Sequence, residues 1–574
     1  MRSFIYRNYA QDCAWTRVVS HLACGLLSLE DKDDRPKIYP SVDRDEWGIR
    51  GKIRFEPNAD FDAMLTVDHI QRAATCCGTT GVAYVPGGQG RAERQGWPVG
   101  EENDLGYFPD QSPSNTNYDT VALEMNLFTG NGGTITSLTG YQSSINDSDF
   151  RSYNTGNLTF FIDNDGLTDM EQFTQELRYT SLEGEFVEYV AGLYYYFREF
   201  DRFLDQQLDI GAFIGRGERV FGLAQSRFVN STSTSYAGFA NLTFNLTDSF
   251  RVSTGGRLQY DEADVFGINE AAFDGTFLAP FAPNQGERAA ERDDTALSWR
   301  VALEYDVNPD ALIYASVVRG YKSLGVNGLG TLITAEQPIV DPEIPTAYEL
   351  GWKTELLDRA VRLNGSIFRT TFKDFQAQAI VLNPATQIGE FFLASAGELR
   401  TQGVEVQLDA EPVVGFTLSG GVSYIDAEYT DFPGAPCYDS QTAAEGCIGG
   451  SQDLTGEPLV GVSDWNVTAN ARYEVPIDPL ELDVYALATY TYRTDFNTTT
   501  DPLTEVDGYG TVDAFLGLIT QDGLGVQVFV KNLFDDFYSI GRTTAGRNQS
   551  GYNLQQSLAY DYKRRFGVSL SYRY

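Results

Sequence analysis

Two cysteines are the residues whose types and spacing most directly suggest chemistry. Cys437 and Cys447 bracket the polar stretch "CYDSQTAAEGC", and in an oxidising compartment they could close a small disulfide. The whole chain has only 2 histidines, so a zinc site built from His and Cys ligands is not expected. We therefore predict a disulfide in this loop and no metal site.

The sequence lacks the short motifs that position a catalytic nucleophile, a metal-bound water or a nucleotide. We find no GxSxG, no HExxH, no Walker loop and no GxGxxG before a helix. Acidic pairs such as Asp43 with Asp45 and Glu101 with Glu102 lie in polar stretches, where solvated surface explains them better than general acid–base work. We therefore predict that the protein is not an enzyme and needs no cofactor.

The composition narrows the class of protein further. The chain has 574 residues and a net charge of −38, and it lacks the clustered Lys and Arg that a nucleic-acid surface requires. It contains 33 Tyr, 36 Phe and 56 Gly, a mixture that favours strands and turns over helices. No stretch approaches the ~20 apolar residues of a transmembrane helix, whereas a transmembrane barrel needs only alternation.

Apolar and polar residues alternate along many long stretches that must form the framework. In residues 250–261, 187–197 and 482–492, one face has an aliphatic centre with aromatic ends. The opposite face of 250–261 carries Arg, Gln and Asp. This pattern is typical of a barrel wall that meets lipid between two aromatic girdles. The last such stretch places on one face Phe566, Val568, Leu570, Tyr572 and Tyr574.

The connections between these stretches alternate between two kinds. Short turns are expected at positions such as 57–60 and 247–249. Long polar loops are expected at 144–168, 201–231 and 264–293. Short turns on one rim and long loops on the other are typical of outer-membrane barrels.

About 19 strands can be counted from residue 47 onward. We predict an all-β fold, namely a large antiparallel transmembrane β-barrel at residues 47–574 with long extracellular loops and short periplasmic turns. The preceding residues 1–46 are predicted to be an irregular segment.

Several segments together resemble the barrel of TonB-dependent receptors. They are "FRVSTGGRLQYDE" (250–262), "LIYASVVRGYKSLGVN" (312–327), "AYELGWKTELLD" (347–358) and "VFVKNLFDDFY" (528–538). Their order and spacing extend the resemblance over about residues 47–574. Barrels of the family have 22 strands and follow a signal peptide, a coupling box and a plug. The resemblance therefore implies a chain without the plug and the first three strands, which accounts for the count of 19.

The resemblance also implies a role and partners. The chain is expected in the outer membrane of a Gram-negative bacterium, where it would import a scarce solute. The first candidate for this solute is a ferric siderophore, and the others are haem, cobalamin or an oligosaccharide. Long loops help to form the ligand pocket in this family, so Tyr321, Lys322 and Asn327 are expected to contact a small-molecule ligand.

The expected partners are outer-membrane lipid, a TonB-type energy-coupling protein and the barrel assembly machinery. The assembly machinery would read the terminal aromatic strand that runs from Phe566 to Tyr574. In this sequence we find neither a coupling box nor a plug for the energy-coupling protein to act on. Nucleic acid is not expected as a partner.

Two other functions compete with uptake. A barrel without a plug would act as a passive pore or be an inert remnant of a receptor. The same alternation would also suit a soluble, secreted all-β protein that acts on carbohydrate, because one face of a sandwich is solvated as well.

Overall fold

Nearly all of the described chain is β-structure. The computed structural model describes residues 43–75, 80–83, 99–103, 113–152, 161–209, 221–271, 286–327, 338–382, 389–438, 441–548, 551–559 and 561–573. The helical elements among them are three single 3₁₀ turns, η1 (Ala443–Glu445), η2 (Asp478–Leu480) and η3 (Pro502–Thr504). The described residues contain no helix that is long and apolar enough to cross a membrane.

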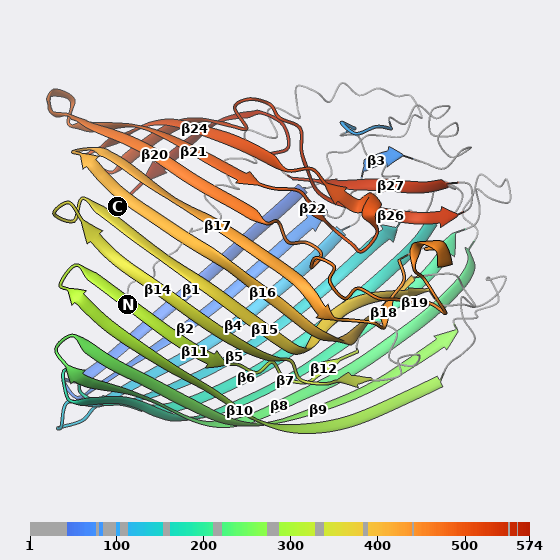
Figure 1. Ribbon diagram of the computed structural model, residues 1–574, viewed down its shortest axis with the longest axis horizontal. Helices are drawn as coiled ribbons and strands as arrows, with labels where there is room; N and C mark the ends of the chain where they lie inside the picture. Colours follow the sequence, from blue (N-terminus) through green and yellow to red (C-terminus); the bar gives the residue numbers. More distant parts are fainter. Residues whose placement is uncertain are drawn as a thin grey trace.

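One antiparallel sheet of 19 strands forms the wall seen in Figure 1. Each strand pairs with the strands before and after it in the sheet along the chain, as in a meander. The strands are β1 (Asp43–Asn58), β2 (Phe61–Thr75), β4 (Pro113–Phe128), β5 (Thr134–Ser152), β6 (Phe161–Thr180), β7 (Val187–Asp209), β8 (Phe221–Thr247), β9 (Phe250–Ala271), β10 (Gly286–Asn308), β11 (Ala311–Arg319), β14 (Ile344–Leu356), β15 (Val361–Leu382), β16 (Gly389–Val413), β17 (Phe416–Asp431), β20 (Trp465–Ile477), β21 (Leu482–Arg493), β24 (Tyr509–Thr520), β25 (Leu524–Lys531) and β28 (Arg565–Tyr572).

The two rims of this sheet differ, and we call them the turn end and the loop end. Short turns lie together at the left of Figure 1, and the long connections with their small sheets lie at the right. The turn between β24 and β25 needs Gly523, whose φ is 87°. A Cβ added there would lie 2.2 Å from the carbonyl oxygen of Arg573.

The register of the strands assigns each side chain to one of two faces, because residues directly opposite each other point to the same side. Leu258 of β9 pairs with Leu297 of β10, and both are exposed. Asp261 and Ala263 lie at the alternate positions of β9 and are buried. The first face is therefore the apolar outer wall, and the second faces the lumen.

Nine further short strands among the described residues lie at the loop end. They form pairs or a triplet rather than joining the wall. They are β12 (Gly325–Val326) with β13 (Ile339–Val340), β18 (Ala435–Pro436) with β19 (Ser451–Gln452), β22 (Phe496–Asn497) with β23 (Glu505–Val506), and β3 (Thr80–Ala83) with β26 (Ser539–Asn548) and β27 (Gly551–Leu558).

The predicted fold class is confirmed, but several predicted connections are too long. Loops were expected at 144–168, 201–231 and 264–293, whereas β5 to β10 extend far into these ranges. Beyond the apolar band of the outer wall both faces of a strand meet water, so the alternation weakens there although the hydrogen-bonded ladder continues.

The division of the chain at residues 46 and 47 stays a prediction. Strand β1 begins at Asp43, and residues 1–42 lie outside the described part. Tyr574 lies outside it as well.

Candidate ligand-binding face of the barrel

The connection between β11 and β14 leaves the wall and folds against the lumen. We call its described residues, 320–327 and 338–343, the inner hairpin; it contains β12 and β13. Its apolar side chains Leu324 and Ile339 pack against lumen-facing Val229, Ala263 and Val265. The hairpin is therefore held by the inner surface of the barrel (β12 in Figure 1).

Lys322 joins the two arms of the inner hairpin. Its backbone N–H donates to the Glu343 carbonyl at 2.9 Å, and the Glu343 N–H donates back to the Lys322 carbonyl at 3.0 Å. The Lys322 Nζ lies 3.2 Å from Glu343 Oε2, and Glu343 is only 6% exposed. Pairing with this ammonium compensates the burial of the carboxylate. The Lys322 side chain remains about half exposed to the lumen.

Asn327 ties the same hairpin to β16. Its amide Nδ2 donates to the Leu393 carbonyl at 3.0 Å, and the Leu393 N–H donates to Asn327 Oδ1 at 2.6 Å. Asn327 is 3% exposed. Its two amide atoms already bind the main chain of Leu393, so this contact fixes the hairpin.

Tyr321 belongs to the inner hairpin and lies near Asp261 and Asp294 of the wall. Burial, followed by the nearby charges of Asp261 and Asp294, raises the pKa of its phenol well above the usual value. The hydroxyl is therefore neutral at physiological pH. The structure thus brings Tyr321, Lys322 and Asn327 together on one hairpin, and their contact with a ligand stays a prediction.

Gln376 of β15 is a residue of this face that the sequence did not reveal. Its Nε2 donates to the carbonyls of Ser323 at 2.8 Å and of Asp341 at 2.9 Å, one on each arm of the hairpin. Its backbone N–H donates to Glu343 Oε2 at 3.1 Å. Gln376 lies two residues after Asp374, whose φ is 53° and at which the pairing of β15 with β16 is interrupted without a change of register. No sequence motif marks such a residue, because its partners lie 33 to 53 positions away.

A polar hollow of about 700 Å³ lies between β10 and the inner hairpin, next to the ends of β11 and β14. Its lining includes Trp299 and Arg319 of the wall, Tyr321 of the inner hairpin, and Asp374 of β15. Arg292 and Asp341 also line the hollow, and they form an ion pair. The hollow therefore offers both hydrogen-bond donors and acceptors.

A second hollow, of about 570 Å³, is apolar and lies on the outer wall. Leu193, Tyr236 and Leu258 line it around Gly238, which has no side chain to fill the space. Because this hollow faces outward, it is not part of the candidate ligand face.

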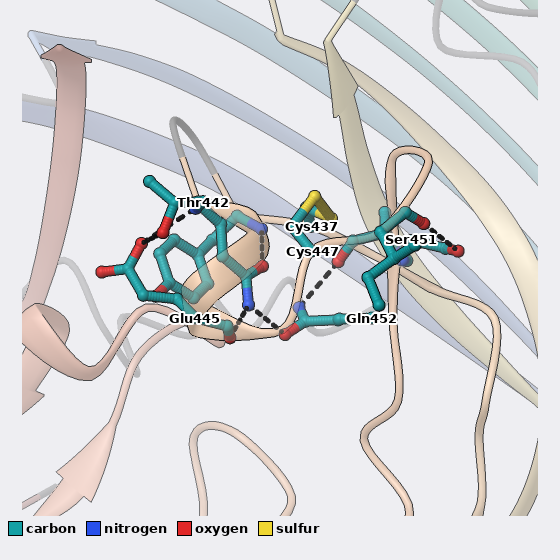
Figure 2. The surroundings of a disulfide bond; sticks show 10 residues. Cys437, Thr442, Glu445, Cys447, Ser451 and Gln452 are labelled. Carbon is teal, nitrogen blue, oxygen red and sulfur yellow. Dashed lines mark hydrogen bonds between the residues drawn. A yellow bond between two sulfur atoms is a disulfide. The ribbon is translucent and has the colours of Figure 1, made fainter. Parts of the chain in front are cut away.

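Residues 429–438 and 441–462 form a compact cap at the loop end. The structure contains a disulfide between Cys437 and Cys447, shown in Figure 2. Beside it, Gln452 Nε2 donates to the Pro436 carbonyl at 2.8 Å and Gln441 Nε2 donates to Gln452 Oε1 at 3.0 Å (Figure 2).

The cap has an apolar core of its own. Its buried members from the cap and from β15 and β16 are Ala377, Ala396, Leu399, Tyr429, Phe432, Ala435 and Leu454. This core anchors the disulfide loop to the barrel wall.

A three-stranded sheet joins the first long connection to the last. In this loop sheet, β27 pairs with β26 and with β3. The buried amide of Gln556 donates to the carbonyls of Glu101 at 2.9 Å and Asn103 at 3.1 Å. Arg542 adds an ion pair to Glu101 at 2.8 Å. Residues more than 400 positions apart therefore form one surface at the loop end.

The terminal strand β28 lies in the wall beside β25. Its exposed large apolar side chains share the outer face, and they are Phe566, Val568, Leu570 and Tyr572. This agrees with a lipid-facing strand. Recognition of the strand by the assembly machinery stays a prediction.

Comparison with known proteins identifies the family of this barrel. The model of the family described as TonB dependent receptor-like, beta-barrel, matches residues 78–533. The chain belongs to this family. Its fold and its outer-membrane location are thereby established, the long connections are extracellular, and the soluble all-β alternative is wrong.

Relatives in the curated set are receptors. The pesticin receptor of Yersinia pestis is 24% identical over 318 residues, which cover 54% of this chain and 40% of that receptor. The probable TonB-dependent siderophore receptor PiuA of Acinetobacter baumannii is 26% identical over 167 residues, 28% of this chain and 21% of that protein. The chain thus matches about two fifths or less of the length of these relatives.

Solved structures match more of the chain at lower identity. The ferric yersiniabactin uptake receptor FyuA from Yersinia pestis aligns with a TM-score of 0.68 and 18% identity, over 94% of this chain and 73% of that one. The siderophore receptor PiuA from Acinetobacter baumannii aligns with a TM-score of 0.68 and 18% identity, over 94% and 76% of the two chains. At this identity the likeness shows the fold alone.

Proposed function

We propose that this barrel is an outer-membrane receptor and transporter for energy-coupled uptake of a scarce solute. The observation that carries the proposal is the structure of the extracellular end, where the inner hairpin and the cap pack against wall strands and the loop sheet joins two long connections. A family of receptors with this fold supports it. Coupling to a TonB-type protein is proposed from the family alone.

A ferric siderophore is the solute we propose first, ahead of haem, cobalamin or an oligosaccharide. The relatives named for siderophore uptake support this order. Cells that depend on this chain as their only receptor should take up radioactive iron supplied as a ferric siderophore, and an uncoupler of the proton gradient should abolish the uptake. Uptake that is indifferent to the uncoupler would contradict energy coupling.

Planar bilayer recordings separate transport from a passive pore. A transporter whose lumen is narrowed by the inner hairpin should show small currents. Large ungated currents, combined with no ligand-dependent growth, would favour the pore.

A further inference from the structure

We propose that the outer wall beside the polar hollow binds the phosphate-bearing headgroup of an outer-leaflet acyl lipid. The site consists of Arg319, Arg369 and Lys373, which we call the outer basic cluster. The inference rests on the outer-membrane location and the geometry of the wall. It does not depend on the proposed uptake function.

The register places the cluster on the lipid side of the wall. Arg319 is directly opposite Trp299, and Arg369 is directly opposite Tyr348. Tyr348 is 55% exposed on the outer face, so the two arginines point outward with their aromatic partners. Lys373 follows Arg369 by four residues in the same strand and shares its face.

The cluster also lies at the depth of lipid headgroups. Arg319 is the last residue of β11 before the chain enters an extracellular connection. Trp299 and Tyr348 belong to the extracellular aromatic girdle, which marks the boundary between acyl chains and headgroups. Long cationic side chains at this depth extend towards the headgroup phosphates.

None of the three cations forms an ion pair with the described residues. Glu398 is opposite Lys373 in the register, but the two do not form a salt bridge. By contrast, the lumen-facing Arg292 and Lys322 are each paired with a carboxylate. Unpaired cations facing lipid are costly unless an external anion neutralises them.

Charge on the neighbouring outer wall favours this sector over others. Just beyond the girdle on β6 and β7, Glu171 is opposite Glu199, and on β9 and β10, Glu262 is opposite Asp293. These carboxylates repel a phosphate. A lipid phosphate that diffuses around the barrel therefore meets attraction at β11 to β15 and repulsion at β6 to β10.

The polar hollow reaches the outer face of the wall at Leu297, Trp299 and Arg319, and there it supplies room for the headgroup. Arg319 and Trp299 form part of its lining, next to the exposed carboxylate of Asp374. Arginine binds phosphate in a bidentate manner, and a carboxylate accepts hydrogen bonds from hydroxyl groups. The site therefore fits a headgroup that carries phosphate together with hydroxyls.

The test compares lipid binding to folded variants by native mass spectrometry in detergent. The probes are a dilauroyl lipid with a monophosphate headgroup and the same diacyl lipid without phosphate. The test variant is the triple substitution Arg319→Ala, Arg369→Ala and Lys373→Ala. The matched control replaces three lumen-facing cations, with Arg257→Ala, Arg300→Ala and Lys353→Ala; Arg300 is opposite Val318, one residue from Arg319, so it projects to the other side of the wall.

We expect the test variant to need roughly a hundredfold more phosphate lipid for half-saturation, about fivefold per cation, and the control to match the wild type. If the triple variant does not migrate as a folded barrel in a heat-modifiability gel, the single changes Arg319→Gln and Arg369→Gln should each cost about fivefold. Equal binding by wild type and variants overturns the proposal. So does equal binding of the phosphate-free lipid, or equally effective competition by inorganic phosphate.

Discussion

The Gln376 side chain connects the barrel wall to both arms of the inner hairpin. Its amide donates to two backbone carbonyls, and its own N–H donates to the buried carboxylate of Glu343. The two carbonyls are partly buried, and a carbonyl that loses its donor away from water costs more than an average hydrogen bond contributes. The position of Lys322 and Asn327 near the lumen therefore depends on a residue that touches neither side chain.

Gln376→Ala should release the hairpin from the wall. We expect the free energy of unfolding to fall by about 1–3 kcal/mol, because two partly buried carbonyls lose their donor. Urea unfolding in lipid vesicles and the rate of tryptic cleavage after Lys322 measure the two effects. Gln521→Ala, in an exposed turn, is the control. An unchanged cleavage rate would show that other contacts hold the hairpin.

Asn532 ends the strand β25 in a backbone conformation that few residues adopt. Its φ is 50°, and asparagine tolerates this left-handed region better than most residues. Its side chain is 1% exposed, donates to the Asp536 carbonyl at 2.9 Å and accepts from the Asp536 N–H at 3.1 Å. It therefore shapes the turn that follows β25.

Asn532→Ala should lower the free energy of unfolding by about 2–3 kcal/mol, because it removes the hydrogen bonds and strains the backbone. Asn532→Gly removes the same bonds but accepts the positive φ, so it should cost less. Both are measured by urea unfolding in vesicles. If glycine costs as much as alanine, backbone strain does not contribute at this position.

The strands of the barrel extend beyond the membrane, and this determines where the loops begin. Strand β10 starts at Gly286 and pairs with β9 from there down to the turn end. Residues 286–294 are rich in Glu, Arg and Asp on both faces, so their sequence reads as a loop. Cross-strand backbone hydrogen bonds do not depend on side-chain polarity, which is why the ladder continues through this stretch.

The disulfide between Cys437 and Cys447 should stabilise the extracellular cap alone. Replacing Cys437 and Cys447 with serine should loosen the cap by about 2–3 kcal/mol, because the bond closes a short loop of chain. Amide hydrogen exchange of residues 441–448 should accelerate, whereas exchange in β20 and β21 provides the internal control. Acceleration that extends into those wall strands would mean that the disulfide stabilises the barrel itself.

The cost of a charged substitution depends on which face of the barrel wall it occupies. Leu350 lies near the middle of β14 and is exposed on the outer face. Ser316 lies on the lumen face of β11, opposite Glu349. Lipid cannot solvate a charge, whereas a wet lumen can, so the same substitution should have different costs at these two positions.

Leu350→Arg should lower the free energy of unfolding in lipid vesicles by about 2–4 kcal/mol, and Ser316→Arg should leave it nearly unchanged. Urea midpoints of the two variants check this difference. Equal midpoints would contradict the assignment of the faces.

The edges of the wall are a property of the molecule as a whole. Nineteen antiparallel strands alternate in direction, so the first strand, β1, and the last, β28, run the same way. Within the described residues these two strands are not paired with each other. A direct contact between them would have to be parallel, and any antiparallel closure needs an odd number of strands between them. The loop sheet links connections next to both edges at the extracellular end.

The sequence alone determined the strand pattern, the two kinds of connection and the outer-membrane class. These features depend on the alternation of apolar and polar residues, which is visible among residues adjacent in the sequence. The same alternation places Phe566, Val568, Leu570 and Tyr572 on one face, and these side chains are exposed. The tertiary structure alone decided that the connection after Arg319 folds into the lumen. Its contacts join residues such as Asn327 and Leu393, 66 positions apart, and no local pattern records such a pairing.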